Sequence, residues 1–379
     1  MELLGKSRDE LREWLAGLGE PAYRGDQIYR ALYQERNFEI AKMTALPAEL
    51  RERLEHEATI TLPTVRQRYF SKDGSVRYLF GLGETSKDKF ATETQSSQRK
   101  TEAQIARTVS RPASVEAVWM PSENRQTICI STQAGCAVDC QFCLTAQLGL
   151  IRNLTAGEVL AQVLLPLEEH KAQLAPQTNI VLMGQGEPLL NFDAVMAALR
   201  ILLDPEGVGS SPKHVTLSTS GIVPGIERLG LERVRPKLAI SLNASNDEQR
   251  DELMPINKKY PLSVLLDACK KYPLRPWEHL TFEYVMLGGE NDAPEDARRV
   301  VRLLGPLKSV KVNLIPWNPG ELPYRESSAE AIEEFRRILV DRGIPAFVRY
   351  SRGRDVMAAC GQLALTQIEG AQPPAVGYR

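Results

Sequence analysis

Beyond residue 126 the sequence alternates short apolar runs with amphipathic segments, and this alternation limits the fold more than any other feature. Seven runs have the length and the β-branched composition of buried strands: 127–131, 180–183, 215–218, 238–242, 280–287, 310–315 and 346–350. Predicted helices fill the intervals, and the segments Thr155-Ala-Gly-Glu158 and Ser327-Ser-Ala-Glu330 match the capping box that begins a helix. Such alternation predicts right-handed crossovers and a parallel sheet, with too few units for a closed eight-stranded barrel. We therefore expect an α/β fold with an open, partial (β/α)6-type parallel barrel.

The first sixty residues predict a separate helical accessory domain at 1–60. The segment Ser7-Arg-Asp-Glu10 is a capping box, and leucines and aromatic residues follow it at helical spacing. Pro47 is placed to be the first residue of a third helix. The apolar stripes of these helices are most simply explained as a core.

Two other regions flank the predicted barrel, which we assign to residues 127–352. Residues 61–126 are predicted to be rich in strands, with a hairpin turn at Asp73-Gly74. Within them, residues 84–113 are polar and have few apolar anchors, which indicates a flexible insertion. Residues 353–379 form a predicted C-terminal tail with little periodicity.

The formal net charge of −1 gives no general electrostatic signal for nucleic acid, so any contact with RNA must come from a local basic patch. The chain begins without the basic and apolar pattern of a signal peptide, and we find no apolar run long enough to cross a bilayer. We therefore expect a cytoplasmic protein without membrane contact. A reducing compartment also suits free thiolates.

Three cysteines fall within eight residues in the order C-x3-C-x2-C: Cys136, Cys140 and Cys143. Iron–sulfur clusters usually have four thiolate ligands, so three from one loop leave one iron open to a substrate or cofactor. Structural zinc is the alternative, but it requires four ligands. No second pair of cysteines or histidines follows at a zinc spacing. The motif therefore favours a [4Fe–4S] cluster.

With an aromatic residue, Phe142, before its last cysteine, this motif resembles the cluster loop of radical S-adenosylmethionine (SAM) enzymes. In that family the open iron is chelated by the amino and carboxylate groups of SAM. Electron transfer then breaks the sulfonium and produces a 5′-deoxyadenosyl radical. The resemblance implies a [4Fe–4S] cluster and SAM as cofactors.

Polar residues follow the later predicted strands, where the site of a parallel α/β sheet lies. The segment Gly184-Gln-Gly186-Glu187-Pro188 resembles the element of radical SAM enzymes that receives the ammonium group of SAM, with Gln185 between its two glycines. Singly, each of the other residues is a usual turn or cap residue. Together they are candidates to bind the ribose and adenine of SAM: Ser218, Ser241, Asn243 and Asn318.

A longer resemblance, to the RlmN family, covers nearly the whole chain except residues 84–113. It is carried by residues 154–158, 184–191, 215–224, 238–247, 255–261, 312–319 and 358–363. RlmN enzymes methylate C2 of an adenosine in 23S ribosomal RNA and of an anticodon-loop adenosine in certain tRNAs. The resemblance implies 23S rRNA and tRNA as partners, two SAM molecules per turnover, and an electron donor such as flavodoxin. We expect a monomer.

The resemblance also implies roles for individual residues. Cys360 would take a methyl group from one SAM, become S-methylcysteine and carry the carbon to the adenine. Glu116 would accept the proton from C2, and Cys129 would attack Cys360 and release the product with formation of a disulfide. From the sequence alone, a lone cysteine such as Cys129 is more simply a small buried hydrophobe. The implied SAM contacts are Gly186, Glu187, Ser218, Ser241, Leu242, Asn243 and Asn318.

Three alternatives remain open at this point. The C8-methylating relatives linked to antibiotic resistance share the cluster, the carrier cysteine and the fold. A radical SAM activating enzyme would need no carrier such as Cys360, and an RNA-binding protein with a structural metal would cleave no SAM. The chain departs from the family at Asn243, where a histidine is usual, and an amide cannot become cationic. We also predict that Arg352 and Arg354, which lie in a local concentration of arginines, contact RNA phosphates.

Overall fold

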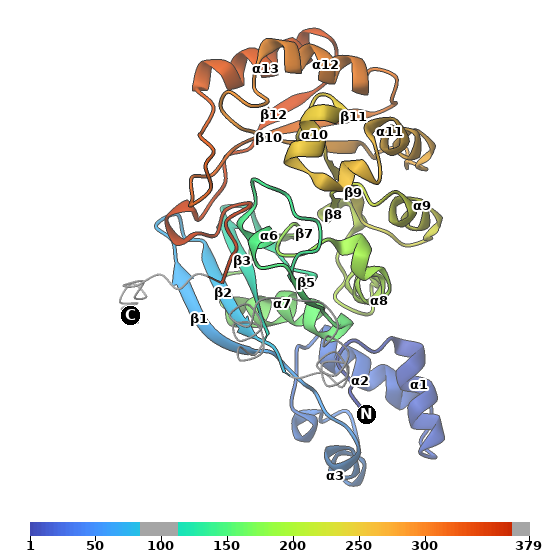
Figure 1. Cartoon of the computed structure of the whole chain (residues 1–379). Coiled ribbons are helices and arrows are strands. Elements are labelled where there is room, and N and C mark those ends of the chain that lie inside the picture. The colour runs from blue at the N-terminus through green and yellow to red at the C-terminus, as the bar shows by residue number, and fades with distance from the viewer. Residues whose placement is uncertain (84–112, 366–379) are drawn as a thin grey trace, which may run out of the picture.

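The computed structural model describes residues 1–83 and 113–365, and ten of its strands form one mixed sheet (Figure 1). Seven neighbouring strands are parallel, and they coincide with the seven predicted ones: β4 (Arg125–Cys129), β7 (Gln177–Leu182), β8 (Val215–Thr219), β9 (Lys237–Ser241), β10 (Leu280–Met286), β11 (Val310–Pro316) and β12 (Ala346–Val348). Among the described residues no ladder joins the two edge strands, so the sheet is open as predicted.

Three antiparallel strands extend this sheet beyond β4: β1 (Thr64–Phe70), β2 (Val76–Gly81) and β3 (Ser114–Ser122). The predicted hairpin turn lies between β1 and β2, where Gly74 has a φ of +83°. The strand-rich region is therefore continuous with the parallel sheet and does not form a second one. The predicted insertion, except for residue 113, lies outside the described residues.

Helices pack against one face of the parallel strands and enclose the main core (Figure 1). They are α7 (Ala156–Glu169), α8 (Phe192–Leu203), α9 (Val223–Leu231), α10 (Asp247–Leu253), α11 (Leu262–Lys271), α12 (Pro294–Leu304) and α13 (Ala329–Asp341). The predicted capping box at Thr155 is present. The one at Ser327 is wrong by one residue, because the hydroxyl of Ser328 accepts the hydrogen bond of the first turn while Ser327 is buried.

Shorter elements complete the chain. A small hairpin, which the sequence analysis did not predict, pairs β5 (Gln133–Gly135) with β6 (Leu150–Asn153) around the four-residue helix α6 (Leu144–Gln147). The 3-10 helices are η1 (Ile40–Lys42), η3 (Lys171–Gln173), η4 (Pro188–Asn191), η5 (Pro212–His214), η6 (Pro255–Lys258) and η7 (Arg354–Val356). No helix in the described part of the chain is long and apolar enough to cross a membrane.

The N-terminal helices are α1 (Arg8–Gly17), α2 (Tyr23–Tyr33) and α3 (Ala48–Glu57). The capping box at Ser7 is present, whereas Pro47 lies at the N-cap of α3, one residue before the predicted position. These helices join the barrel through close contacts. Gly5 packs so tightly on α7 that a Cβ atom there would lie 2.6 Å from the backbone nitrogen of Gly157. The Tyr29 hydroxyl donates a hydrogen bond to Asp204 at 2.8 Å.

Replacing Tyr29 with phenylalanine is expected to weaken this joint. The ring would keep its packing, but Asp204 would lose a hydrogen bond to a charged acceptor, which contributes about 1.5 kcal/mol. Urea unfolding should show a lower free energy of unfolding by that amount. Tyr23→Phe is the control, because Tyr23 is 51% exposed. Equal effects of the two substitutions would show that the hydrogen bond from Tyr29 to Asp204 does not stabilise the protein.

The first part of the predicted tail, up to residue 365, folds back over the other face of the sheet. Val356, Ala358 and Leu363 pack there in one apolar cluster with Val118 and Cys129. The β1–β2 turn anchors this segment from outside. The Asp73 carboxylate accepts a hydrogen bond from Gly353 N–H at 2.9 Å, and this bond helps to hold the pKa of Asp73 below its usual range.

Candidate active site

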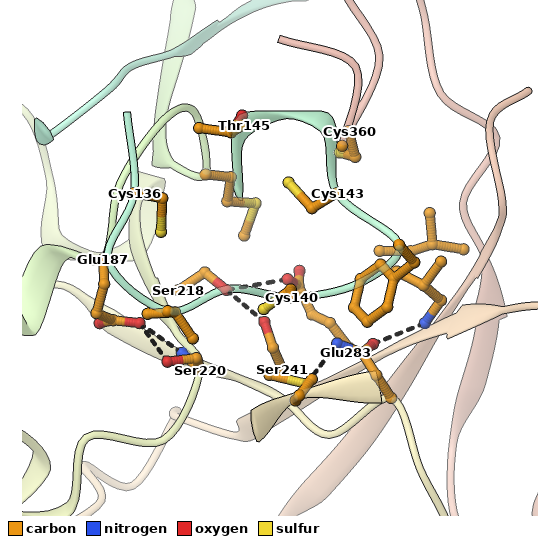
Figure 2. A pocket seen from close by; sticks show the side chains of 18 of the residues that line it. Cys136, Cys140, Cys143, Thr145, Glu187, Ser218, Ser220, Ser241, Glu283 and Cys360 are labelled. Atoms are coloured by element: carbon orange, nitrogen blue, oxygen red, sulfur yellow. Dashed lines mark hydrogen bonds between the residues drawn. The ribbon is translucent and has the colours of Figure 1, made fainter. Parts of the chain in front are cut away.

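The carboxyl ends of the parallel strands surround a pocket that all three cysteines of the motif line (Figure 2). Figure 2 shows Glu187 and Ser220 at one end of this pocket and Cys360 at the other, with the cysteine loop between them. The structure thus brings together most of the predicted site residues. Predicted residues among its lining are Gly186, Ser218, Ser241, Asn243, Asn318 and Cys360.

Backbone contacts fix the cysteine loop. Gly135, which precedes Cys136, has a φ of +74°, and a Cβ atom there would lie only 1.8 Å from the Gly149 carbonyl oxygen. Only glycine fits this approach. The Cys136 N–H donates to the Gly149 oxygen at 3.0 Å, and the Cys143 N–H donates to the Cys140 oxygen at 3.1 Å. The loop is therefore a preformed turn between β5 and β6.

The donor set of this loop fits an iron–sulfur cluster better than zinc. Burial raises the pKa of all three thiols, that of Cys136 to about 11, and a bound metal would favour their thiolates. In the described part of the chain no three Cys, His, Asp or Glu side chains are placed to hold a single metal ion. With three cysteine ligands from this pocket and no fourth, one iron of a bound cluster would keep an open coordination site.

Glu187 is fixed firmly beside the cysteine loop. Its carboxylate accepts hydrogen bonds from the N–H and the hydroxyl of Ser220, both at 2.7 Å, and from Leu189 N–H at 3.0 Å. Burial nevertheless raises its pKa. Gly186, with a φ of +95°, lies where a Cβ atom would be 2.7 Å from the backbone nitrogen of Gln133. The carboxylate can therefore receive a cation without movement of the backbone.

The serines at the ends of β8 and β9 lie within reach of each other. The Ser218 hydroxyl donates to the Glu283 carboxylate at 3.0 Å and lies 3.5 Å from the Ser241 oxygen. Asn243 has a φ of +55°, a conformation that asparagine tolerates, and its amide oxygen accepts a hydrogen bond from Val285 N–H at 2.8 Å. Asn243 therefore shapes this wall of the pocket.

The structure does not bring Leu242 into the pocket. Its side chain is fully buried in the main core, and its N–H donates to the Glu283 carbonyl oxygen at 2.9 Å. Its carbonyl oxygen accepts a hydrogen bond from Arg250. The backbone N–H and carbonyl groups of Leu242 thus both form hydrogen bonds within the protein.

Asn318 connects the pocket to the tail. Its amide donates to the Cys360 carbonyl oxygen at 3.0 Å and to the Ser351 hydroxyl at 2.9 Å. The Leu144 N–H, next to the last cysteine of the motif, donates to the Gly361 carbonyl oxygen at 2.8 Å. Two elements of the cofactor pocket thus hold the peptide around Cys360 in place.

Cys360 lies where this pocket meets a second, larger cavity inside the sheet, and it lines both. Cys129 lines the second cavity as well, so the two lone cysteines share one space. Both are free thiols. Cys360 is exposed and Cys129 is buried. Burial raises the pKa of Cys129, and the neighbouring Cys360 adds to that rise.

Glu116 lies on β3, on the same face of the sheet as Cys129, but it lines neither cavity. It is fully buried and forms an ion pair with Arg77 at 2.7 Å. The Leu365 N–H, from the tail, donates to its second oxygen at 3.0 Å. Burial raises the pKa of Glu116, and Arg77 opposes that rise. The tail therefore covers the carboxylate in this conformation.

Arg250 and Glu283 are polar residues of the site that were not predicted from the sequence, and Gln185 was predicted only as part of the glycine element. Arg250 is fully buried and donates to the carbonyl oxygens of Ser220, Ser241 and Leu242. Glu283 lines both cavities, and Gln185 accepts a hydrogen bond from the Glu116 N–H at 3.2 Å. Of Arg250 and Glu283, Glu283 alone could have been found from the sequence, because it is a charged residue inside the apolar run 280–287.

Comparison with known proteins identifies this arrangement. The model of the radical SAM superfamily matches residues 130–304, and that of the ribosomal RNA large subunit methyltransferase N-terminal domain matches residues 1–60. A crystal structure of a radical SAM methyltransferase from Sphaerobacter thermophilus superimposes with a TM-score of 0.82 and 40% sequence identity, covering 96% of this chain and 99% of that one. The fold and the site define a radical SAM enzyme.

Two curated relatives identify the family of this chain within the radical SAM superfamily. A probable dual-specificity RNA methyltransferase RlmN from Koribacter versatilis is 47% identical, over 93% of this chain and 98% of its own. The dual-specificity RNA methyltransferase RlmN of Geobacter sulfurreducens is 44% identical, over 96% of this chain and 92% of its own. The chain belongs to the RlmN family. Membership in the radical SAM superfamily implies SAM and an iron–sulfur cluster as cofactors.

Proposed function

We propose that this enzyme methylates C2 of an adenosine in 23S rRNA and of an adenosine in the tRNA anticodon loop, through an S-methylcysteine at Cys360. The proposal uses a [4Fe–4S] cluster on Cys136, Cys140 and Cys143, two SAM molecules per turnover, and an external electron donor. One observation carries it. Cys360 lies at the junction between the cofactor pocket and the cavity that also holds Cys129.

When bound, the cluster and SAM supply the radical that ordinary methyl transfer lacks, because C2 of adenine is not nucleophilic. The residues of the chain hold the methyl carbon in position and later release it to the RNA. The Sγ atom of Cys360 loses its proton and attacks the methyl carbon of one SAM; the bond from that carbon to the sulfonium breaks, and S-adenosylhomocysteine leaves. Its junction position lets the methylated sulfur face both the cofactor and the RNA base, so the reactive carbon is held close to its target.

Cys129 and Glu116 complete the cycle. The radical that the cluster and SAM would supply removes a hydrogen atom from the S-methyl group of Cys360, and the resulting carbon radical bonds to C2. Glu116 then takes the proton of C2, and the surplus electron would return to the cluster. This requires that Leu365 N–H release the carboxylate of Glu116. The thiolate of Cys129 then attacks Sγ of Cys360. The bond between Cys360 and the carbon breaks, the carbon takes a proton and leaves as the methyl group of the RNA, and a disulfide forms. A reductant of the thiol class restores both thiols before the next turnover.

Nucleoside mass spectrometry tests this function. Reconstituted protein, SAM, a reductant and unmodified 23S rRNA or tRNA are incubated without oxygen and compared with standards of 2- and 8-methyladenosine. We expect 2-methyladenosine in both RNAs. If 8-methyladenosine formed instead, the C8 alternative would be correct. If SAM were cleaved without methylation of either RNA, the proposed substrate would be wrong.

A further inference from the structure

The second cavity has a volume of about 700 Å³, within the usual range for ligand sites, and runs from the two cysteines toward the amino ends of the parallel strands. Side chains alternate along a strand, so inward-facing residues form columns of every second position. On β11 such a column runs from Lys311 through Asn313 to Ile315, and on β9 from Lys237 to Ser241. Each column begins with a cation and ends beside the cofactor pocket.

Positive charge is concentrated at the far end of this cavity. Cationic lining residues are Arg125, Lys213, Lys237, Lys311, Arg349 and Arg352. Among the lining residues that the structure describes, Glu283 is the one acid, and it lies at the inner end, bonded to Ser218. A chain with a net charge of −1 has no general excess of cations, so this concentration is local.

Of these cations Arg352 alone forms an ion pair within the described residues, and Lys237 and Lys311 are the unpaired ones that are half-buried. Within the described residues, neither Lys237 nor Lys311 forms an ion pair or a side-chain hydrogen bond. Both are half-buried, and burial lowers the pKa of each. Positive neighbours lower them further, Lys311 acting on Lys237 and Arg349 on Lys311. The carboxylate of Glu278 raises the pKa of Lys237, but this carboxylate already forms an ion pair with Arg275 at 2.9 Å.

Half-buried cations that repel one another are stabilised when an anion binds between them. Arg352 and Arg354 form ion pairs with Asp73 and Glu326, and their contact with phosphates stays a prediction. Arg349 differs from them. It donates a hydrogen bond to the neutral Asn313 at 3.2 Å, so its charge stays available to the cavity. Lys237 and Lys311, which are half-buried, and Arg349, which is exposed, thus provide an anion site that lines this cavity.

We infer that this cavity is the channel through which the RNA reaches Cys360, with Lys237, Lys311 and Arg349 binding the phosphates that flank the target adenosine. The inference rests on the proposed function. Phosphate contacts provide most of the affinity of proteins for nucleic acid. A base turned out of its stack can enter a cavity that a duplex cannot. RNA and SAM would then approach Cys360 from opposite ends of the barrel.

The charge-removing variant K237Q/K311Q tests the channel. Its binding of a labelled, unmodified tRNA is measured by fluorescence anisotropy at several salt concentrations, with holoenzyme, SAM and no reductant. We expect affinity to fall by roughly tenfold, and the slope of log K against log salt to become smaller by about 1 for each lysine. The matched control is K270Q/K271Q, which removes two exposed charges from α11, outside the cavity.

A third variant, K237R/K311R, keeps both charges and should bind tRNA nearly as the parent does. It therefore distinguishes a loss of binding caused by lost charge from one caused by misfolding. Equal affinity and slope in K237Q/K311Q and the parent would overturn the channel. So would equal losses in K237Q/K311Q and K270Q/K271Q, or a failure of the arginine variant to recover binding while its iron content and circular dichroism match the parent. If the parent bound neither tRNA nor rRNA, the proposed function would fail as well.

Discussion

Cys360→Ala is expected to reduce RNA methylation below detection while SAM is still cleaved. The thiol lies at the junction of the two cavities, and Cys143, the other described thiol that lines both, belongs to the cysteine motif. The cluster loop does not use the Cys360 side chain, so loss of that side chain should leave the iron content unchanged. Nucleoside mass spectrometry and the amount of 5′-deoxyadenosine measure the two outcomes separately.

The Cys129→Ala variant should stop at a later step of the reaction, the release of the carbon from Cys360. Cys360 can still take the methyl group and attack the base, but no neighbouring thiol releases the carbon. A covalent protein–RNA adduct should therefore accumulate and appear as a nuclease-sensitive band of lower mobility. Cys269→Ala is the matched control, because Cys269 is buried in α11 and packs in the main core. If the Cys129 variant methylated RNA through many turnovers, its proposed role would be wrong.

Much of this architecture could be predicted because burial leaves a clear pattern in the sequence. The face of the parallel strands that the helices cover carries apolar residues at alternate positions, such as Ile180 and Leu182 on β7, and this pattern is visible in the sequence. The caps at Ser7 and Thr155 were predictable because their hydrogen bonds are local. The error at Ser327 has a physical reason as well. Two consecutive serines offer the same cap one residue apart, and packing of the first serine decides between them.

The hairpin of β5 and β6 left no comparable signal. Its strands are short and carry glycine and polar residues, and their pairing is fixed by the close approach of Gly135 to Gly149. Arg250 is also invisible to local pattern, because it lies in a polar helical segment and its carbonyl partners follow two different strands. The candidate site was accessible where a motif carried it, as in the cysteine loop, and inaccessible where tertiary contacts alone assembled it.

The ion pair of Arg77 and Glu116 shows how a tertiary contact can control both stability and the site. Both side chains are fully buried, and the Arg77 guanidinium also lies 4.1 Å from the centre of the Tyr69 ring. Removal of one partner of a buried pair usually costs about 3–5 kcal/mol, because the other charge is left in a poorly solvated place. We expect Arg77→Met to lower the stability of the protein by that amount.

This loss should depend on pH in a direction that the structure determines. Burial already raises the pKa of Glu116, and Arg77 opposes that rise, so Arg77→Met should raise it further. A carboxyl whose folded pKa exceeds its unfolded value contributes stability at low pH, and this contribution is lost as pH rises through the folded pKa. The deficit of Arg77→Met in urea unfolding should therefore be smaller at pH 6 than at pH 8.5.

Arg68→Met is the control for this prediction, since Arg68 and Glu169 form a partly exposed pair in the same region, with side chains 38% and 31% exposed. Its loss should cost at most about 1 kcal/mol, with little dependence on pH. The double variant R77M/E116M should recover much of the stability, because no buried charge is left alone, yet it should not methylate RNA. Equal deficits of Arg77→Met at both pH values would show that Glu116 does not take up a proton when Arg77 is lost.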